Sequence, residues 1–335
     1  MHTKHVDRNT HGDTKPLARV AVLDDWQHIA EHSADWSALR QRAEVVFFHQ
    51  PFGSKDELIA SLVDFDVILA MRERTAFPND VVEKLPRLKF FNMTGRRARH
   101  LDAMARHGIT VSITGGGEDG ADTAEHSLAM MLSAARRIPE GNESIRQGAF
   151  QENVAPGQRL TGKTVGILGF GLIGGRVASY CQALGMNVIA WSRSMTPEKA
   201  AATHVEAVDI DALFDRADIV SIHLVLSPQT EGIVGREQLA RLRQGAILVN
   251  TSRGPLIDEQ ALLGALNERR IQAALDVFAE EPLPRNHPFR TAPNVVLTPH
   301  VGYCTFENYE TFFRNSIENT MAFLNGAPIR RYASQ

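Results

Sequence analysis

The chain has 335 residues, of which 43% are hydrophobic and 22% are charged, with a formal net charge of -3. This length favours two domains over one, and the charge balance gives no general attraction for nucleic acid or for an anionic membrane. No apolar run is long enough to cross a bilayer, the first residues lack a signal-peptide core, and the two cysteines stand far apart. We therefore expect a cytoplasmic protein without disulfides, bound metal, nucleic-acid partners or membrane partners.

Polar residues without periodicity fill positions 1–17, which predicts a disordered tail. From Ala18, apolar runs alternate with amphipathic stretches, the pattern of a parallel sheet covered by helices. Met71 and Arg72 follow one expected strand and Gly95 follows another, at the edge where open α/β sheets bind ligands. They are candidates for binding a substrate carboxylate, although a solvated surface arginine is an equally good interpretation of Arg72. The strands of this first domain are expected at residues 20–23, 43–48, 67–70, 88–93 and 110–113.

Four glycines within residues 115–120 break the periodicity and predict a hinge between domains. A long amphipathic helix is expected over residues 122–137, followed by a polar segment over residues 141–159. Strand and helix patterns then continue from residue 164 to residue 298, which indicates a doubly wound sheet of five or six strands. The last helical pattern, residues 306–326, is expected to return to the first domain.

The strongest single motif is a glycine-rich turn that reads Gly-Phe-Gly-Leu-Ile-Gly and stands between an apolar strand, residues 165–168, and a helical segment, residues 176–184. Its first glycine would make the tight turn, its second would admit a pyrophosphate, and its third would let the helix lie close to the strand. The phosphate would then sit on the helix N-terminus. An ordinary turn between a strand and a helix is the competing interpretation. The cofactor-binding residues predicted here are Gly169, Gly171, Leu172, Ile173 and Gly174.

The end of the following strand, Ser192-Arg193-Ser194, bears on the choice of cofactor. NAD-dependent enzymes of this fold place an acidic residue there to bind the ribose 2′-hydroxyl. No acid stands at these three positions, and an arginine flanked by two hydroxyls suits a 2′-phosphate. The segment therefore favours NADP(H) over NAD(H), with a solvated Arg193 as the alternative.

Three polar residues, Arg253, Glu281 and His300, each follow an apolar strand further along the chain. In an open α/β sheet they would reach the same edge as the glycine turn. A guanidinium binds a carboxylate and polarises the neighbouring carbonyl, an imidazole gives or takes a proton, and a carboxylate tunes the imidazole. Together with a nicotinamide cofactor, this set predicts the interconversion of a 2-oxo acid and a 2-hydroxy acid.

With these motifs the chain resembles the D-isomer-specific 2-hydroxyacid dehydrogenase family over residues 18–332. In that family the arginine of the Asn-x-x-Arg-Gly motif, the glutamate before the Glu-Pro proline and the histidine of Thr-Pro-His form the catalytic set. The resemblance thus implies catalytic roles for Arg253, Glu281 and His300, and cofactor binding by Thr251 and Asp276 in the same motifs. The matching segments are Gly-Ile-Leu-Gly-Phe-Gly-Leu-Ile-Gly (166–174), Asn-Thr-Ser-Arg-Gly-Pro (250–255), Leu-Asp-Val-Phe-Ala-Glu-Glu-Pro-Leu-Pro (275–284) and Leu-Thr-Pro-His-Val-Gly (297–302).

The resemblance also implies an architecture: two Rossmann-like or flavodoxin-like doubly wound parallel-sheet domains of the α/β class, with a cleft between them, in a homodimer. Residues 18–120 and 304–335 would form a discontinuous substrate domain, and residues 121–303 the dinucleotide-binding domain. The expected reaction reduces a small 2-oxo acid such as glyoxylate or hydroxypyruvate, or oxidises a D-2-hydroxy acid, 3-phosphoglycerate being one such substrate. The alternative from another class is a dinucleotide-sensing corepressor, because the family includes corepressors that keep the same catalytic residues.

Overall fold

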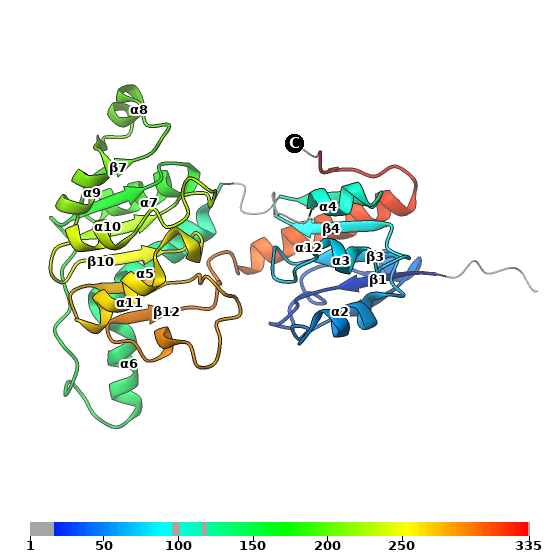
Figure 1. Cartoon of the computed structure of the whole chain (residues 1–335), viewed down its shortest axis with the longest axis horizontal. Helices are drawn as coiled ribbons and strands as arrows, with labels where there is room; N and C mark the ends of the chain where they lie inside the picture. The colour runs from blue at the N-terminus through cyan, green and yellow to red at the C-terminus, as the bar shows by residue number, and fades with distance from the viewer. Residues whose placement is uncertain (1–16, 96–100, 116–118, 334–335) are drawn as a thin grey trace, which may run out of the picture. The chain divides into compact units, whose positions relative to one another are not determined.

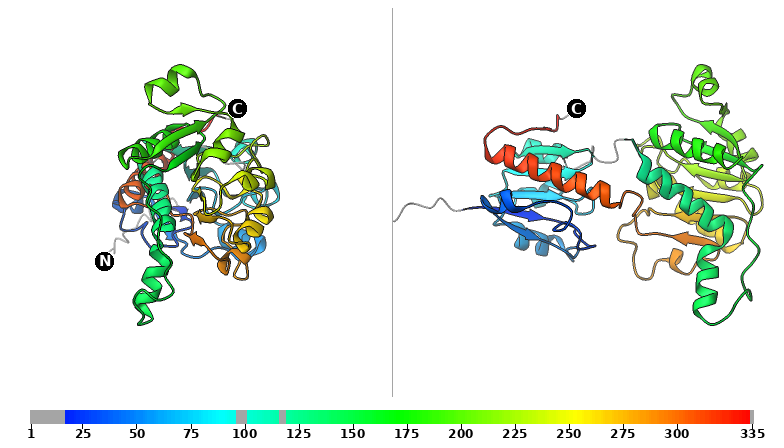
Figure 2. Two further views of the ribbon diagram at one scale, coloured as in Figure 1. Left: turned by 90° about the vertical axis from the view of Figure 1, so that its left-hand side faces the viewer. Right: turned by 180° about the vertical axis from the view of Figure 1, so that it is seen from behind.

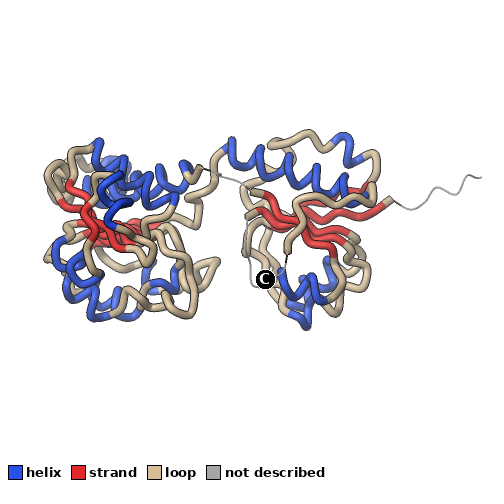
Figure 3. The backbone as a smooth tube through the Cα atoms, turned by 90° about the horizontal axis from the view of Figure 1, so that it is seen from above, coloured by secondary structure: helices blue, strands red, loops and turns tan. Residues whose placement is uncertain are grey.

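The computed structural model describes residues 17–95, 101–115 and 119–333. The chain divides into two compact units, Met1–Gly116 with Tyr309–Gln335 and Gly117–Asn308, hereafter unit 1 and unit 2 (Figure 1). Within each unit a parallel sheet carries helices on both faces (Figure 3), which confirms the predicted α/β class with two parallel-sheet domains. The predicted disordered tail, residues 1–17, lies outside the described residues apart from Leu17.

The sheet of unit 1 has five strands in the order β2-β1-β3-β4-β5, and all neighbouring strands are parallel. The central strands read as continuous apolar runs because helices cover both faces of the sheet. The strands are β1 (Ala18–Val22), β2 (Ala43–Phe47), β3 (Val67–Ala70), β4 (Phe90–Thr94) and β5 (Thr110–Thr114). The helices are α1 (Ser37–Arg40), α2 (Lys55–Leu62), α3 (Asn79–Val82), α4 (Leu101–Arg106) and α12 (Phe306–Leu324).

Helix α12 packs against the sheet of unit 1 (Figure 2, right). Phe323 stacks on Phe90 of β4 with ring centroids 4.6 Å apart. The buried Asn92 donates to Ser316 Oγ over 2.9 Å and accepts from Asn319 Nδ2 over 2.7 Å. A buried amide must be hydrogen-bonded, and here a helix 224 residues downstream supplies the partner. The end of the chain therefore completes the core of unit 1.

The sheet of unit 2 has seven parallel strands in the order β12-β11-β10-β9-β6-β7-β8. This is the dinucleotide-binding order with one added strand, and the strand order reverses between β6 and β9. The two-residue strand β8 is the one that the sequence pattern did not predict. The strands are β6 (Thr164–Leu168), β7 (Asn187–Trp191), β8 (Glu206–Ala207), β9 (Ile219–Ile222), β10 (Ile247–Asn250), β11 (Gln272–Leu275) and β12 (Val295–Leu297).

Two apolar clusters cover the two faces of this sheet, because alternate residues of a strand point to opposite faces. In β10, Ile247 and Val249 belong to the cluster that contains Met130 and Met131 of α5, whereas Leu248 belongs to the other cluster. The helices are α5 (Ala121–Arg136), α6 (Ile138–Arg146), α7 (Leu172–Ala183), α8 (Pro197–Ala202), α9 (Ile210–Arg216), α10 (Arg236–Arg241) and α11 (Glu259–Asn267), with 3-10 turns η1 (Gly254–Leu256) and η2 (Pro288–Arg290).

The start of one helix was predicted wrongly, and one helix was not predicted. Helix α7 begins at Leu172 rather than near Arg176, because Gly171 is its N-cap and the turn leads directly into the helix. Helix α6, for which no helix was predicted, overlaps the start of the polar segment at residues 141–159; its proline stands in the first turn, where no backbone donor is lost. Among the described residues, no helix is both long and apolar enough to cross a membrane.

Candidate active site

The glycine turn lies at the carboxyl end of β6, beside the point where the strand order of unit 2 reverses. Gly169 has a φ of +104°, and its amide donates to the Trp191 carbonyl of β7 over 2.8 Å. A Cβ at residue 169 would lie 2.6 Å from the His223 carbonyl oxygen, and a Cβ at residue 174 would lie 2.1 Å from the Gly169 carbonyl oxygen. Both glycines are therefore required by contacts within the protein itself.

Gly171 differs from its two neighbours in the motif. A Cβ built on it meets nothing within 4 Å. It caps α7 without a side-chain hydrogen bond, so amides of the first helical turn are left for a ligand. An open position at the N-terminus of a 12-residue helix is the cradle that a pyrophosphate requires. The predicted dinucleotide site therefore fits the geometry, and Leu172, 58% exposed, lies at its rim.

The segment that bears on cofactor choice is a short turn after β7. The Ser192 and Ser194 hydroxyls are 3.2 Å apart, and Arg193 is exposed. Sequence reasoning missed a cation at the glycine turn itself, Lys199 of α8, whose ammonium group donates to the Phe170 carbonyl over 2.8 Å. The glycine turn and the end of β7 thus both lie close to positive charge.

His223 lies directly behind the glycine turn, at the end of β9. Its Nε2 is 2.8 Å from Ser221 Oγ. Burial lowers the pKa of His223 to about 4, because a charged imidazole loses its hydration there. The imidazole is therefore neutral at physiological pH, and His223 packs beneath the glycine turn.

His300 and Glu281, predicted as catalytic residues, lie together. His300 Nδ1 is 2.6 Å from Glu281 Oε2, and the other carboxylate oxygen of Glu281 accepts from the Phe278 amide over 2.9 Å. The Glu281 carboxylate is thus held from two sides. It fixes the orientation of the His300 ring through Nδ1, and Nε2 is the other ring nitrogen. The two side chains stay partly accessible, at 24% and 34% exposure.

Arg253, the third predicted catalytic residue, is on a loop packed against the loop that carries Glu281. A Cβ on Gly254 would lie 2.0 Å from the Phe278 carbonyl carbon, so the two backbones are in direct contact. The Arg253 guanidinium donates to the Ser252 carbonyl over 2.7 Å. The loops after β10 and β11 therefore form one continuous structure.

Asp276, predicted to bind the cofactor, is fully buried and holds the His300 loop. Its carboxylate accepts from Thr298 Oγ over 2.6 Å and from the amides of Val301 and Gly302 over 2.9 Å each, and its carbonyl accepts from the His300 amide over 2.7 Å. Burial alone would raise the pKa of Asp276, but hydrogen bonds from His126, Thr298 and the Val301 amide together lower it. The carboxylate is therefore ionised, and it fixes the backbone around His300, whose φ is +54°.

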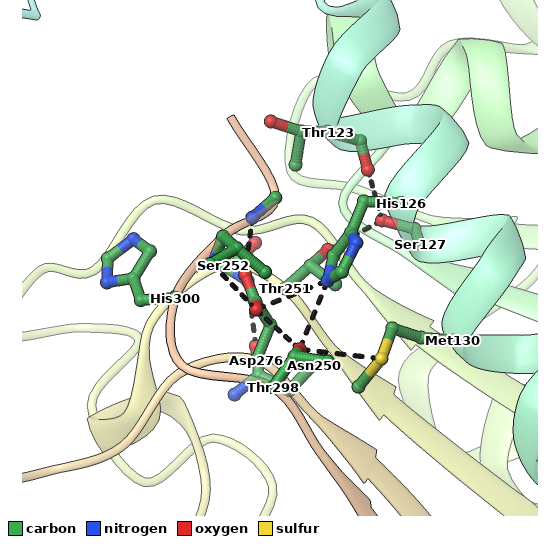
Figure 4. A network of polar contacts seen from close by, with 12 residues as sticks. Thr123, His126, Ser127, Met130, Asn250, Thr251, Ser252, Asp276, Thr298 and His300 are labelled. Carbon is green, nitrogen blue, oxygen red and sulfur yellow. Dashed lines mark hydrogen bonds and ion pairs between the residues drawn. The ribbon is translucent and has the colours of Figure 1, made fainter. Parts of the chain in front are cut away.

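Sequence reasoning missed two polar residues of α5 that reach these loops (Figure 4). His126 Nε2 is 3.1 Å from Thr298 Oγ and 3.2 Å from Asp276 Oδ1. The Ser127 hydroxyl is 2.6 Å from that of Thr251, a predicted cofactor residue. One signal in the sequence could have identified His126. It is a titratable residue one helical turn before Met130, on the face of the helix that carries the buried residues.

In unit 1, the three candidate substrate residues lie together at the ends of β3 and β4. Met71 is buried and its sulfur accepts from Thr94 Oγ over 3.1 Å, while that hydroxyl accepts from the Arg72 amide over 3.0 Å. Gly95 has a φ of +113°, and a Cβ there would lie 3.4 Å from Arg72 Nη1. The Arg72 side chain thus passes over a glycine that leaves room for it.

The family model for "D-isomer specific 2-hydroxyacid dehydrogenase, NAD binding domain" matches residues 128–302. The chain is 30% identical over 322 residues to the hydroxypyruvate reductase of Blautia hydrogenotrophica, covering 93% of this chain and 98% of that protein. It is 41% identical over 258 residues to the D-3-phosphoglycerate dehydrogenase of Methanocaldococcus jannaschii, covering 76% of this chain and 49% of that protein. The chain therefore spans about half the length of the phosphoglycerate dehydrogenases that it matches.

Solved structures give the same picture. A phosphoglycerate oxidoreductase from Vibrio cholerae superposes with a TM-score of 0.88 at 32% identity, covering 93% of this chain and 100% of that one. A putative D-3-phosphoglycerate dehydrogenase from Ralstonia solanacearum has a TM-score of 0.87 at 35% identity, covering 94% and 96% of the two chains. These similarities extend over both units of the fold.

Proposed function

The chain belongs to the D-isomer-specific 2-hydroxyacid dehydrogenase family, and we propose that it transfers a hydride between a nicotinamide dinucleotide and a small 2-oxo acid or D-2-hydroxy acid. The observation that carries this proposal is the 2.6 Å pair of His300 and Glu281, placed at the strand ends of the sheet that also carries the glycine turn. A bound nicotinamide would supply or accept the hydride. The relatives named above are dehydrogenases and reductases, which favours the enzyme over the dinucleotide-sensing corepressor.

His300 is the proposed acid and base. During reduction the carbonyl oxygen gains negative charge, and a proton on His300 Nε2 neutralises it to give the hydroxyl group. Glu281 holds Nδ1 and so fixes the ring orientation. In the oxidative direction the same imidazole accepts the hydroxyl proton, with Glu281 stabilising the charge that results.

Arg253 is the proposed carboxylate ligand and electrostatic stabiliser. A guanidinium binds a carboxylate through two hydrogen bonds and, from the same position, stabilises the developing alkoxide. Met71, Arg72 and Gly95 are proposed to bind the rest of the substrate, because Arg72 offers a cation at the carboxyl ends of the strands of unit 1. In this assignment unit 1 is the substrate domain and unit 2 is the dinucleotide-binding domain.

For the cofactor we propose NADP(H) as the preferred form. The support is the absence of an acid at Ser192-Arg193-Ser194, together with the ammonium group of Lys199 at the glycine turn. The remaining proposed cofactor residues are Gly169, Gly171, Leu172, Ile173, Gly174, Thr251 and Asp276, the last two acting through the loops that they hold.

A homodimer is proposed to form through α6. Figures 1 and 2 show this helix projecting from the body of unit 2, and none of its residues is buried. Ile138, Ile145 and Phe150, in or just after the helix, are 54%, 56% and 70% exposed. Such apolar side chains favour a partner surface, and light scattering of Ile145→Glu should then show a monomer where the natural chain shows a dimer.

The cytoplasm is the proposed compartment. Within the described residues, neither Cys181 nor Cys304 is in a disulfide. Burial raises the pKa of Cys181 to about 12, so this thiol is unreactive. Localisation of a fluorescent fusion would test the assignment.

The activity is tested by following nicotinamide absorbance with a panel of 2-oxo acids: glyoxylate, hydroxypyruvate, 3-phosphohydroxypyruvate and pyruvate. Turnover with at least one of them, giving the D-hydroxy product, is expected. Dinucleotide binding without turnover on any acid, in either direction, would favour the corepressor instead.

A further inference from the structure

Helix α5 contributes a side chain to the loop that carries the proposed acid. His126, 19% exposed, extends from α5 to Asp276 and Thr298, while Asp276 itself is 1% exposed (Figure 4). The residues concerned are separated by as many as 172 positions in the chain. None of them lies in the catalytic set of Arg253, Glu281 and His300.

The hydrogen bonds determine where the proton of His126 resides. The Thr298 hydroxyl hydrogen is used in the 2.6 Å bond to Asp276 Oδ1, so Thr298 Oγ can only accept from His126. The ionised carboxylate of Asp276 also accepts and cannot donate. His126 Nε2 therefore carries a hydrogen, which it shares between these two oxygens.

Asp276 transmits this constraint to His300. Three consecutive amides, those of His300, Val301 and Gly302, donate to the carbonyl or the carboxylate of Asp276. His300 has a φ of +54°, a left-handed conformation that is uncommon for any residue except glycine, and the three amide hydrogen bonds to Asp276 hold the backbone in it. Space is also limited, since a Cβ at Gly302 would lie 3.1 Å from Asp276 Oδ2 and 3.3 Å from His126 Cδ2.

We infer that His126 is a positioning residue for hydride transfer: by donating from Nε2 it fixes the Asp276 carboxylate, and through it the backbone that aims His300 at the substrate. This inference rests on the proposed function of His300. His126 touches neither substrate nor cofactor in this scheme. Loss of the His126 side chain should displace the His300 imidazole by up to about an ångström, and a displacement of that size lowers turnover steeply.

The first test compares His126→Leu, His126→Gln and the control Glu125→Gln, which alters an exposed residue of the same helical turn. For His126→Leu, kcat should fall about 10- to 100-fold while cofactor affinity stays within about threefold. His126→Gln should recover most of kcat, because its amide nitrogen can donate from nearly the same place. Unchanged kcat in His126→Leu, or a glutamine variant that folds yet is as impaired as the leucine variant, would overturn the inference.

A second readout does not depend on turnover. In protein labelled with ¹⁵N-histidine, the Nδ1 proton of His300 facing Glu281 is assigned by its disappearance in His300→Asn. This resonance should shift or broaden in His126→Leu and return toward its original position in His126→Gln. If no 2-oxo acid is turned over, the proposed function fails, but the NMR measurement still tests the positioning role of His126. A resonance that is unaltered in His126→Leu would contradict that role.

Should His126→Leu not fold, Thr298→Val carries the test, because it deletes the hydroxyl that joins the imidazole to the carboxylate and keeps the shape of the side chain. It should lower kcat and shift the same resonance. Natural kcat together with a natural resonance in a folded Thr298→Val protein would count against the inference.

Discussion

The glycine turn and the strand-end cluster of Arg253, Glu281 and His300 occupy the same edge of one sheet, yet they are built in different ways. At the turn, shape is set by backbone contacts, such as the 2.1 Å approach that a Cβ on Gly174 would make. Around His300, shape is set by hydrogen bonds that end on Asp276, although the loops of Arg253 and Glu281 also share the backbone contact at Gly254. A substitution in a region fixed by steric contact should cost stability and function together. A substitution in a region fixed by hydrogen bonds can lower activity while the protein remains folded.

The largest effect is expected at the turn. Gly174→Ala forces a methyl group against a backbone oxygen, so unit 2 should lose more than about 4 kcal/mol of unfolding free energy, together with dinucleotide binding. The neighbouring Gly175→Ala meets nothing within 4 Å and should be neutral or stabilising by about 0.5–1 kcal/mol, as for alanine in a helix interior. Urea unfolding and calorimetric titration with NADPH measure both quantities; a stable, cofactor-binding Gly174→Ala protein would break the comparison.

Gly171→Ala sharpens the same contrast within the motif. Its Cβ would enter open space, so the stability of the protein should change by less than about 1 kcal/mol. Dinucleotide affinity should nevertheless fall at least about tenfold, because the methyl group occupies the approach of the pyrophosphate. Equal binding by Gly171→Ala and the natural chain would show that the cradle is elsewhere.

The next largest effect is expected at the cluster. His300→Asn should lower kcat by about 10²- to 10⁴-fold, the size of general acid-base effects, with cofactor binding and stability nearly unchanged. His287 offers a matched control, since its Nε2 is 3.0 Å from Glu259 in another histidine-glutamate pair. His287→Asn should keep kcat within about twofold. Near-normal turnover by His300→Asn would remove the acid from the proposed mechanism.

His223, beneath the turn, should show its role in the pH dependence of stability. Its pKa is about 4 in the folded state, below the ordinary 6.5, so the unfolded chain binds more protons between these values. The stability of unit 2 should therefore be complete above about pH 6.5 and fall by about 3 kcal/mol toward pH 4 through this group. His223→Gln, which cannot be protonated, should flatten the profile of urea midpoints across this range; an identical slope in both proteins would contradict the expectation.

The smallest effect concerns the choice of cofactor. Arg193→Ala should reduce the ratio of kcat/KM for NADPH over NADH by about tenfold, the loss of one charge-assisted contact of about 1.4 kcal/mol. Arg216→Ala removes an exposed arginine that pairs with Glu206 instead, and it should leave the ratio unchanged. A natural preference for NADH that Arg193→Ala does not alter would sink the NADPH assignment.

Much of the fold follows from local sequence. Each βα repeat has its own apolar run, and the glycine turn needs only neighbouring residues, so both were predicted. Helix α6 was missed because Pro139 and Gly141 suggest a break, although proline in a first turn costs no hydrogen bond.

The interior of the site could not be predicted in the same way. Asp276 stands in a matching motif, but its three donors and His126 come together only when β11, β12 and α5 are packed. The His126 bond to Thr298 spans 172 positions, and no local pattern encodes such a pairing. His126 itself reads as one polar residue within an amphipathic helix until its partners are known.

The contact between Gly254 and Phe278 has a consequence for how this protein can change under selection. Because the clash would be with the carbonyl carbon and oxygen of Phe278, both backbone atoms, no substitution of the Phe278 side chain would make room for a Cβ at residue 254. The position therefore lacks a compensating second site. A library that randomises residue 254 together with its neighbours should return only glycine in every genetic background, so lineages can exchange the side chains around this junction while the junction itself stays fixed.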